Sequence, residues 1–397
     1  MNAGVVVSAM FRTPFGRFEG ALKTLTATDL GVYAVNGLLD RVDLSETAVD
    51  AAYVGVGMIA AGVLTPARRI VLGSRLPDET PSLTVDRACC SGLTAIGIGV
   101  REIASGEAGV VVCGGAESLS NTPRLLQRTI PGRPQEMVLD DPLTLRAPFG
   151  DTAIAVYSGE EALAHGIDRR RQDEWALASH GRYFAAEAEG AFAVERPTLE
   201  IAGGREAVRL DVDESPRRDT SMEALEKLRP VYGGPTVTAG NAPGLNDGAA
   251  FLMLAAPDSA DRQGLQILAR IIGYTQVAGS RTSGTWTPAV AIGKLLARHG
   301  MHVGELAAIE INEAYAATPL VSTLKLAGGD SVETERLRRL TNVHGGAVAI
   351  GHPLGASGAR IVMSLINVLM RRGGGIGAAA ICGGYGQGDA LLIEVPS

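Results

Sequence analysis

The sequence Ser91-Gly92-Leu93-Thr94-Ala95-Ile96 opens a run of small and apolar residues that leads to Val110-Val111-Val112-Cys113-Gly114-Gly115. A second stretch repeats this plan, since Ser357-Gly358-Ala359-Arg360-Ile361-Val362 leads to Ala378-Ala379-Ala380-Ile381-Cys382-Gly383-Gly384. Each copy combines a helix that begins with small residues, a β-strand and a Cys-Gly-Gly end. The repeat predicts two similar α/β domains that face one another.

Length and composition support a layered fold with more than one core. The chain has 397 residues, so two or three units with their own hydrophobic cores are expected. Its 46% hydrophobic and 20% charged residues exclude a disordered chain. We expect strands at Val5–Val7, Ala51–Val54 and Val110–Cys113, and a helix from Cys90 to Ala104 that is buried on all sides.

Residues 118–245 differ in composition from the two repeats. They are polar, interrupted by prolines and rich in arginine, which stands out in a protein of net charge −7. One long helix is expected near residues 168–189. We interpret this segment as an inserted loop domain.

Several classes of protein are excluded by the same numbers. The net charge of −7, without a long Lys/Arg run, argues against nucleic-acid binding. No apolar stretch reaches the roughly 20 residues of a membrane span. The N-terminus is typical of a first β-strand, and Val395-Pro396-Ser397 is not a peroxisomal signal. Four cysteines without regular spacing favour a reducing, cytoplasmic location, and no ligand spacing indicates a metal site.

Cys89 lies in Asp86-Arg87-Ala88-Cys89-Cys90-Ser91-Gly92-Leu93, at the expected start of a helix. An ordinary thiol has a pKa of about 8.5, and the N–H groups and partial positive charge of a helix N-terminus favour its thiolate. A neighbouring imidazole would complete an activated nucleophile. The alternative is that Cys89 and Cys90 are small buried core residues, as free cysteines often are.

His352 is the leading candidate for that imidazole. Glycines flank it in Gly351-His352-Pro353-Leu354-Gly355, so backbone can approach a ligand closely, and a helix begins directly after it. His344 is the competing histidine. Asn312 lies at a strand-to-helix junction, where its amide can orient a water molecule or donate to a carbonyl oxygen. From the local residues alone, a plain helix N-cap is the favoured interpretation of Asn312.

Cys382 precedes Gly383-Gly384-Tyr385-Gly386, a segment that can aim backbone N–H groups inward. A second thiol near Cys89 can move a proton at a substrate carbon, whereas the alternative is a core cysteine at the end of a buried strand. Gly55–Ala60 matches a dinucleotide-binding fingerprint superficially, but Pro66 interrupts the helix that must follow. Two thiols, an imidazole and an amide together favour covalent acyl chemistry.

Taken together, the motifs resemble those of the thiolase family over essentially the whole chain. The motifs are Cys89-x-Ser91-Gly92, Asn312-Glu313-Ala314, Gly351-His352-Pro353-Leu354-Gly355-Ala356-Ser357-Gly358 and Cys382-x-Gly384-x-Gly386. The resemblance implies a five-layered α-β-α-β-α fold of two similar domains plus a loop domain that grips coenzyme A. The corresponding bounds are 1–117 with 246–265 returning to it, 118–245 for the loop domain, and 266–397.

The same resemblance implies a role for each motif. Cys89 attacks the substrate and becomes acylated, and His352 activates it. His352 and a water held by Asn312 bind one oxyanion, while the backbone N–H groups of Cys89 and Gly384 bind the other. Cys382 is the acid/base at the α-carbon. Coenzyme A and acyl-CoA are then substrates, no cofactor is bound permanently, and a homodimer or homotetramer is expected.

Contacts to coenzyme A are expected from the loop domain and its borders. Arg217 and Arg218 are expected to meet the phosphates. The stretch Gly240–Ala249 is similar to a further family signature, which places Ala242 and Pro243 beside the ligand, and Phe149 precedes the first loop-domain helix.

The chain departs from the family pattern at several of these positions. Pro243 replaces a serine, Asp86 replaces an asparagine, Cys90 replaces a small residue, and Phe149 and Trp286 can reshape the acyl pocket. These departures support an alternative function, an acyl-CoA binding or lipid-transfer protein with weak or no turnover.

Overall fold

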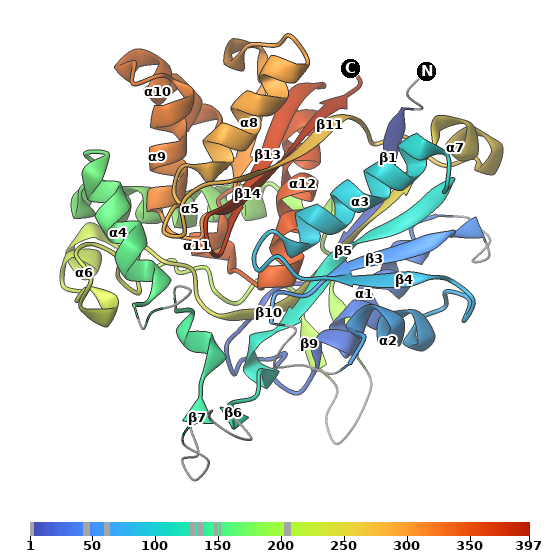
Figure 1. Cartoon of the computed structure of the whole chain (residues 1–397), viewed down its shortest axis with the longest axis horizontal. Helices are drawn as coiled ribbons and strands as arrows, with labels where there is room; N and C mark the ends of the chain where they lie inside the picture. The colour runs from blue at the N-terminus through green and yellow to red at the C-terminus, as the bar shows by residue number, and fades with distance from the viewer. Residues whose placement is uncertain are drawn as a thin grey trace.

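A ten-stranded sheet crosses this computed structural model, which describes residues 4–42, 48–58, 64–126, 132, 139–146, 150, 152–201 and 208–397. The strands run in the order β12-β13-β14-β11-β1-β10-β5-β3-β4, and β2 pairs with β10 (Figure 1). Their bounds are β1 (Val5–Arg12), β2 (Gly16–Arg17), β3 (Ala51–Gly55), β4 (Ser82–Val85), β5 (Val110–Ser118), β10 (Asn246–Ala255), β11 (Ala269–Ala278), β12 (Ala308–Ile311), β13 (Gly375–Gly383) and β14 (Gln387–Val395).

The sheet consists of two halves with the same topology. In the first half, β3 is parallel to β5, β5 is antiparallel to β10, and β10 is antiparallel to β1. In the second half, β12, β13, β14 and β11 repeat these relations in the same order. The predicted internal repeat is therefore confirmed. The halves join where β1 pairs with β11, with Val5 opposite Ile271, a connection that the sequence did not indicate.

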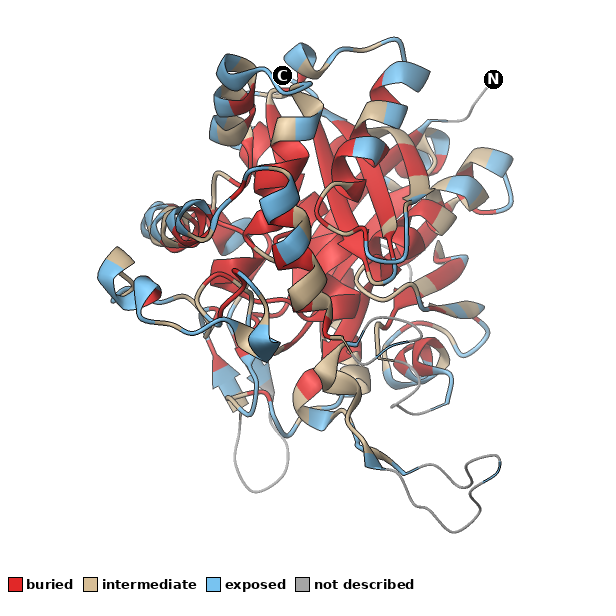
Figure 2. Ribbon diagram, turned by 60° about the vertical axis from the view of Figure 1, so that its left-hand side comes forward, coloured by how far each residue is buried: buried red, intermediate tan, exposed pale blue. Residues whose placement is uncertain are grey.

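Two buried helices, α3 (Ser91–Ser105) and α12 (Leu354–Arg371), lie between the two halves of the sheet and contact each other and strands of both (Figure 1). Helices α1 (Ala27–Leu39) and α2 (Pro66–Gly73) cover the outer face of the first half, and α8 (Thr287–Arg298) covers that of the second. This gives the five layers expected from the family resemblance. Figure 2 shows the buried residues gathered in these inner layers.

The expected strands at Val5–Val7, Ala51–Val54 and Val110–Cys113 lie in β1, β3 and β5. The expectation that the Cys90–Ala104 helix is buried on all sides is wrong in part. The first seven residues of α3 are buried, but Arg101 and Ser105 are exposed because the C-terminal end of the helix reaches the surface.

The segment between β5 and β10 contains short elements around one long helix. The expected helix near 168–189 is α5 (Arg169–Ala188), which begins where the Asp168 carboxylate accepts the Arg171 N–H at 2.9 Å. The domain bounds themselves stay a prediction. The other elements here are η3 (Leu119–Asn121), β6 (Leu125–Leu126), β7 (Leu139–Asp140), η4 (Pro142–Thr144), α4 (Ile154–Ala164), η5 (Ala191–Val194), β8 (Leu199–Ile201), β9 (Val208–Leu210), α6 (Met222–Glu226) and η6 (Val231–Gly233).

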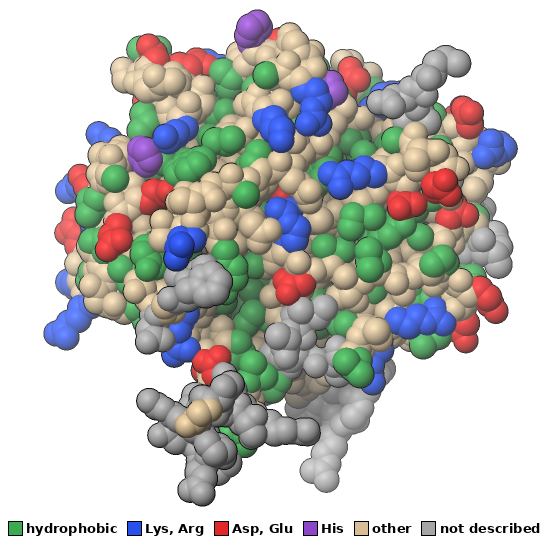
Figure 3. Space-filling model, in the orientation of Figure 1, with side chains coloured by type: hydrophobic (Ala, Val, Ile, Leu, Met, Phe, Trp, Pro, Cys, Tyr) green, Lys and Arg blue, Asp and Glu red, His purple; other side chains and the backbone are tan. Residues whose placement is uncertain are grey.

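The remaining elements all follow β10 in the sequence. They are α7 (Pro257–Gln263), η7 (Val303–Glu305), α9 (Ala317–Leu326), α10 (Ser331–Leu340) and α11 (Ala347–Ile350). Among the helices of the described residues, none is long and apolar enough to cross a membrane. On the face seen in Figure 3, the described basic and acidic side chains are interspersed and the cations form no single patch.

Helices α3 and α12 approach each other so closely that only glycine fits at their contact. A Cβ on Gly92 would lie 2.3 Å from the Gly355 carbonyl oxygen, and a Cβ on Gly358 would lie 2.2 Å from the Leu93 nitrogen. Backbone atoms cannot move aside as a flexible side chain can. The repeated Ser-Gly pair, at the start of α3 and one turn into α12, therefore sets the distance between the two halves.

We expect Gly92→Ala to destabilise the protein by about 1–3 kcal/mol or more, because the new methyl group collides with backbone. Gly293→Ala in α8 is the matched control, since a Cβ at Gly293 meets nothing within 4 Å and alanine is the better helix former by about 0.5–1 kcal/mol. Urea unfolding of both variants measures the difference. A Gly92→Ala protein as stable as the native one would contradict the close contact.

Candidate active site

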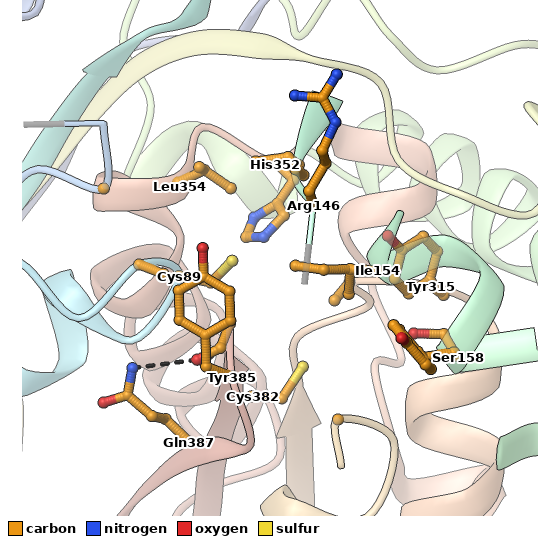
Figure 4. A pocket seen from close by; sticks show the side chains of 18 of the residues that line it. Cys89, Arg146, Ile154, Ser158, Tyr315, His352, Leu354, Cys382, Tyr385 and Gln387 are labelled. Atoms are coloured by element: carbon orange, nitrogen blue, oxygen red, sulfur yellow. Dashed lines mark hydrogen bonds between the residues drawn. The ribbon is translucent and has the colours of Figure 1, made fainter. Parts of the chain in front are cut away.

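The motif residues meet at one cavity of about 600 Å³. Cys89, His352, Cys382 and Gly384 line it, and they come from the start of α3, the start of α12 and the end of β13 (Figure 4). Asn312 lies behind His352 and is fully buried. Residues almost 300 positions apart in the sequence therefore face one space.

Cys89 lies directly before α3 rather than inside it. Ala88 adopts a left-handed conformation (φ 50°), which turns the chain sharply before the helix. The Ser91 hydroxyl fixes this turn, because it accepts the Arg87 N–H at 2.9 Å and donates to the Ala88 carbonyl at 2.5 Å. The strained turn holds the Cys89 side chain at the cavity wall.

Burial raises the pKa of the Cys89 thiol, and the nearby Cys382 and Glu117 raise it further. The N–H groups of Cys89 itself and of Gly384 oppose this rise, because they donate toward the sulfur. These are the two N–H groups expected to bind an oxyanion. The thiol is thus neutral at rest, and a base must take its proton before it attacks.

The hydrogen bonds of His352 fix which ring nitrogen is free. Its Nδ1 lies 2.7 Å from the Ser357 hydroxyl, and that hydroxyl donates to the Pro353 carbonyl at 2.9 Å. Ser357 must therefore accept a hydrogen from Nδ1, which leaves Nε2 unprotonated. Burial, with a contribution from Arg360, lowers the pKa of His352 to about 3, so the ring is neutral at pH 7.

Asn312 presents its amide nitrogen to His352. Its Nδ2 lies 3.5 Å from His352 Nε2, and its oxygen accepts from the Arg360 guanidinium at 3.2 Å. Because arginine can only donate, this contact fixes the amide orientation. The interpretation of Asn312 as a plain helix N-cap is wrong, since α9 begins at Ala317 with Ala316 as its cap.

Glu313, the residue after Asn312, ties the loop segment to the second half. Its carboxylate accepts hydrogen bonds from Trp175 Nε1 at 2.8 Å and the Ser179 hydroxyl at 2.9 Å, both on α5. It also accepts the Val348 N–H at 2.9 Å and an Asn342 amide hydrogen at 3.0 Å. These four bonds hold the Asn312 backbone in place.

Cys382 is the last residue but one of β13, and burial raises its pKa to about 12. Such a thiol holds its proton until a stronger base appears beside it. The other two cysteines are core residues: Cys90 points to the Ile381 carbonyl, 3.7 Å from its sulfur, and Cys113 is fully buried in β5. All four cysteines are free.

Sequence reasoning missed the residues that orient the motifs. Ser357 and Arg360 fix His352 and Asn312, the Asn246 side chain accepts the His352 N–H at 2.9 Å, and Glu117 accepts N–H groups of Gly57 and Gly355. Burial raises the pKa of Glu117 to about 7. One signal was available, because Arg360 is the only charged residue of α12 before Arg371 at its end.

The residues expected to bind coenzyme A are only partly gathered at the cavity. Pro243 lines it, but Ala242 does not. Arg217 and Arg218 are exposed outside the lining, where the Arg218 guanidinium stacks on the Phe184 ring at 4.0 Å. Phe149 lies outside the described residues.

Of the residues that depart from the family pattern, some line the cavity and others do not. Asp86 lines the cavity and accepts the Ala88 N–H at 3.0 Å. Its neighbour in the chain, Arg87, pairs with Asp389 at 2.5 Å. Trp286 does not line the cavity, although Thr282 and Ser283 near it do. Within the described residues, no group of His, Cys, Asp and Glu side chains is arranged to hold a metal ion.

A thiol beside oriented N–H donors, a neutral imidazole and a second thiol define a cysteine-based acyl-transfer site in an α/β fold. The chain belongs to the thiolase family. Residues 5–258 match the thiolase N-terminal domain and residues 265–395 the thiolase C-terminal domain.

Individual relatives agree over the full length. The β-ketoadipyl-CoA thiolase of Pseudomonas knackmussii is 37% identical over 99% of this chain and 100% of its own. The mitochondrial 3-ketoacyl-CoA thiolase of Bos taurus is 36% identical over 98% of each chain. The acetyl-CoA acetyltransferase structure from Bacillus anthracis has a TM-score of 0.92 at 35% identity and covers 100% of both chains. The human mitochondrial 3-ketoacyl-CoA thiolase in complex with CoA has a TM-score of 0.90 at 36% identity, covering 100% of this chain and 98% of that one.

The buried neutral His352 predicts acid sensitivity. Its pKa of about 3 in the fold is below the ordinary value of about 6.5, so the unfolded chain binds one more proton between these pH values. This contribution to stability is present above pH of about 6.5 and is lost as the pH falls toward 3. At pH 4 the loss is on the order of 3 kcal/mol.

We therefore expect His352→Gln to lose less unfolding free energy than the native protein between pH 7 and pH 4. Urea unfolding at several pH values measures it, with the exposed His299→Gln as control. Parallel curves for the native and His352→Gln proteins would show that His352 is not buried as a neutral ring.

Proposed function

We propose that this protein catalyses thiolytic cleavage of 3-ketoacyl-CoA, or the reverse Claisen condensation, through an acyl intermediate on Cys89. One observation carries the proposal: Cys89, His352 and Cys382 line a single cavity, with the Asn312 amide against the His352 ring. Membership of the thiolase family supports a CoA-dependent acyltransferase. Thiolases use coenzyme A as a substrate and need no permanently bound cofactor.

In the first half-reaction, His352 Nε2 takes the Cys89 proton and the thiolate attacks the keto carbon. The bond between this carbon and the α-carbon breaks, so the acyl group remains on Cys89 and acetyl-CoA leaves as an enolate. The Cys382 thiol protonates the enolate carbon. Removing one donor from an oxyanion site typically lowers the rate by about 10²–10³, so the N–H groups of Cys89 and Gly384 are expected to matter greatly.

In the second half-reaction, the Cys382 thiolate takes the proton of an incoming coenzyme A thiol. The coenzyme A sulfur attacks the acyl carbon and Cys89 leaves as a thiolate. The protonated His352 returns its proton to Cys89. All three groups end in their starting forms, and the neutral states favoured by burial are those of the resting enzyme.

The substrate, the location and the oligomeric state are also proposals. The relatives act, by their names, on β-ketoadipyl-CoA, 3-ketoacyl-CoA and acetyl-CoA. We infer an acetyl-CoA C-acyltransferase or C-acetyltransferase of fatty acid metabolism in the cytoplasm, where free thiols persist. We also propose a homodimer or homotetramer. Strand β4 is at the edge of the sheet, where its backbone can pair with a second copy, and its Leu83 is 49% exposed. A binding protein without turnover is not favoured, because the predicted catalytic residues are all present and oriented.

Acyl transfer is tested by mass spectrometry after mixing with acetyl-CoA. We expect an acetyl adduct on Cys89 in the native protein, in Cys382→Ala and in the control Cys113→Ala, which removes a core thiol. Cys89→Ala forms none. Thiolysis of acetoacetyl-CoA should fall at least 10²-fold in both Cys89→Ala and Cys382→Ala, because each loses an essential group. Native turnover no higher than that of Cys89→Ala on any 3-ketoacyl-CoA contradicts the proposed function.

The contact between basic residues and coenzyme A is tested by calorimetry. An Arg217→Ala/Arg218→Ala protein should bind coenzyme A about tenfold more weakly, since a hydrogen bond to a charged group contributes about 1.5–3 kcal/mol before solvent screening. Arg69→Ala, on the outer helix α2, is the exposed control. Equal affinity in the double variant and the control would place the phosphates elsewhere.

A further inference from the structure

The backbone of Tyr385 is in the left-handed conformation, which residues other than glycine rarely adopt. It forms the turn between β13 and β14, with φ of 66° at Tyr385 and 74° at the next residue, Gly386. Bulky residues in this left-handed region are unusual and are found mainly where surrounding structure imposes them at a functional site.

The turn is held at both ends. The Gly386 carbonyl accepts the Gly279 N–H at 2.7 Å, and a Cβ at Gly386 would lie 2.1 Å from the Ser280 oxygen. On the other side, the Gln387 amide donates to the Gly384 carbonyl at 3.1 Å. Gln387 accepts in turn from Arg87 Nε at 2.8 Å, and Arg87 pairs with the buried Asp389. Tyr385 therefore cannot relax without breaking these contacts.

The Tyr385 ring lies in the cavity. Tyr385 lines the same space as Cys89 and Cys382, and Figure 4 shows the three side chains around that space. Even so, 52% of Tyr385 is exposed to solvent. An aromatic side chain that is strained, half exposed and inside a substrate cavity has a surface that the substrate can cover.

The neighbours of Tyr385 define which part of the substrate it meets. The residue before it, Gly384, donates its N–H toward the Cys89 sulfur. Cys382 is three residues away on the same strand end and, in the proposed reaction, delivers a proton to the α-carbon. Tyr385 thus follows directly in the chain after residues that act at both ends of the carbon–carbon bond, and it lines the cavity that they share.

We propose that Tyr385 is a specificity-determining residue that walls the site at the α-carbon. The substrate class is then 3-ketoacyl-CoA that is unbranched at this carbon, because the ring occupies the space that an α-methyl group would need. This inference rests on the proposed function.

The test compares acetoacetyl-CoA with 2-methylacetoacetyl-CoA in thiolysis by the native enzyme and by Tyr385→Phe, Tyr385→Ala and Tyr385→Gly. The ratio of kcat/KM for the branched substrate over the unbranched one should rise about tenfold in Tyr385→Ala and Tyr385→Gly. Tyr385→Phe keeps the ring and should keep the native ratio. An unchanged ratio in the Ala and Gly variants overturns the proposal.

Two controls separate the steric effect of the Tyr385 ring from changes in backbone strain and stability. Tyr232→Gly removes another left-handed tyrosine (φ 53°, 62% exposed) that does not line the cavity, and it should leave the ratio unchanged. The melting temperature of Tyr385→Gly should be no lower than that of the native protein, because glycine removes the strain. If the native enzyme forms no adduct with acetyl-CoA, the proposed function fails. If the adduct forms and the ratio does not change, only the role of Tyr385 fails.

Discussion

The backbone contact between α3 and α12 is the constraint on which the rest of the site depends. Gly92 and Gly358 let the two helices touch with no side chain between them. Cys89 lies directly before one helix and His352 directly before the other, so the contact that joins the two halves also sets the place of nucleophile and base. A side chain at the contact would move both helices apart and separate the reacting groups with them.

Close packing also determines the charge states. With backbone against backbone, no water separates the helices, and the groups beside them are buried. Burial raises the pKa of Cys382 and lowers that of His352, so both are neutral at rest. The few charges that remain need partners. Arg360 donates to the Asn312 amide oxygen and lies 3.6 Å from Glu310, but burial raises the pKa of Glu310 to about 8, so that carboxyl is mostly neutral at pH 7. A buried pair of this kind contributes little to stability, and the contact of Arg360 with Asn312 fixes the amide.

The sequence predicts a residue's role when that role is set by its local motif, and it fails when the role is set by contacts with other segments. Cys89, His352 and Cys382 lie within short motifs next to helix starts and strand ends, and a local pattern was enough to find them. Ser357 and Arg360 act through contacts with residues elsewhere in the motifs, so their roles required the helix geometry. Asn312 shows the opposite error, because local chemistry favoured a cap that the real start of α9 excludes. The contact of Arg217 and Arg218 with phosphates stays a prediction, because it rests on their charge and charge alone does not specify where a side chain lies.

The repeat explains why a symmetric fold has an asymmetric site. Ser91 and Ser357 hold equivalent positions, and each hydroxyl donates to a carbonyl of the turn before its helix. Ser91 then accepts a backbone N–H, whereas Ser357 accepts from the His352 ring. The thiols of the two Cys-Gly-Gly ends are not at equivalent places. Strands β5 and β13 each have nine residues, and Gly115 pairs with the last residue of β3 as Ala380 pairs with the last residue of β12. Cys382 therefore holds the position of Glu117, whereas Cys113 lies earlier in its strand and is fully buried. The two frames are alike, and the site is asymmetric because this one position carries a carboxyl group in the first half and a thiol in the second.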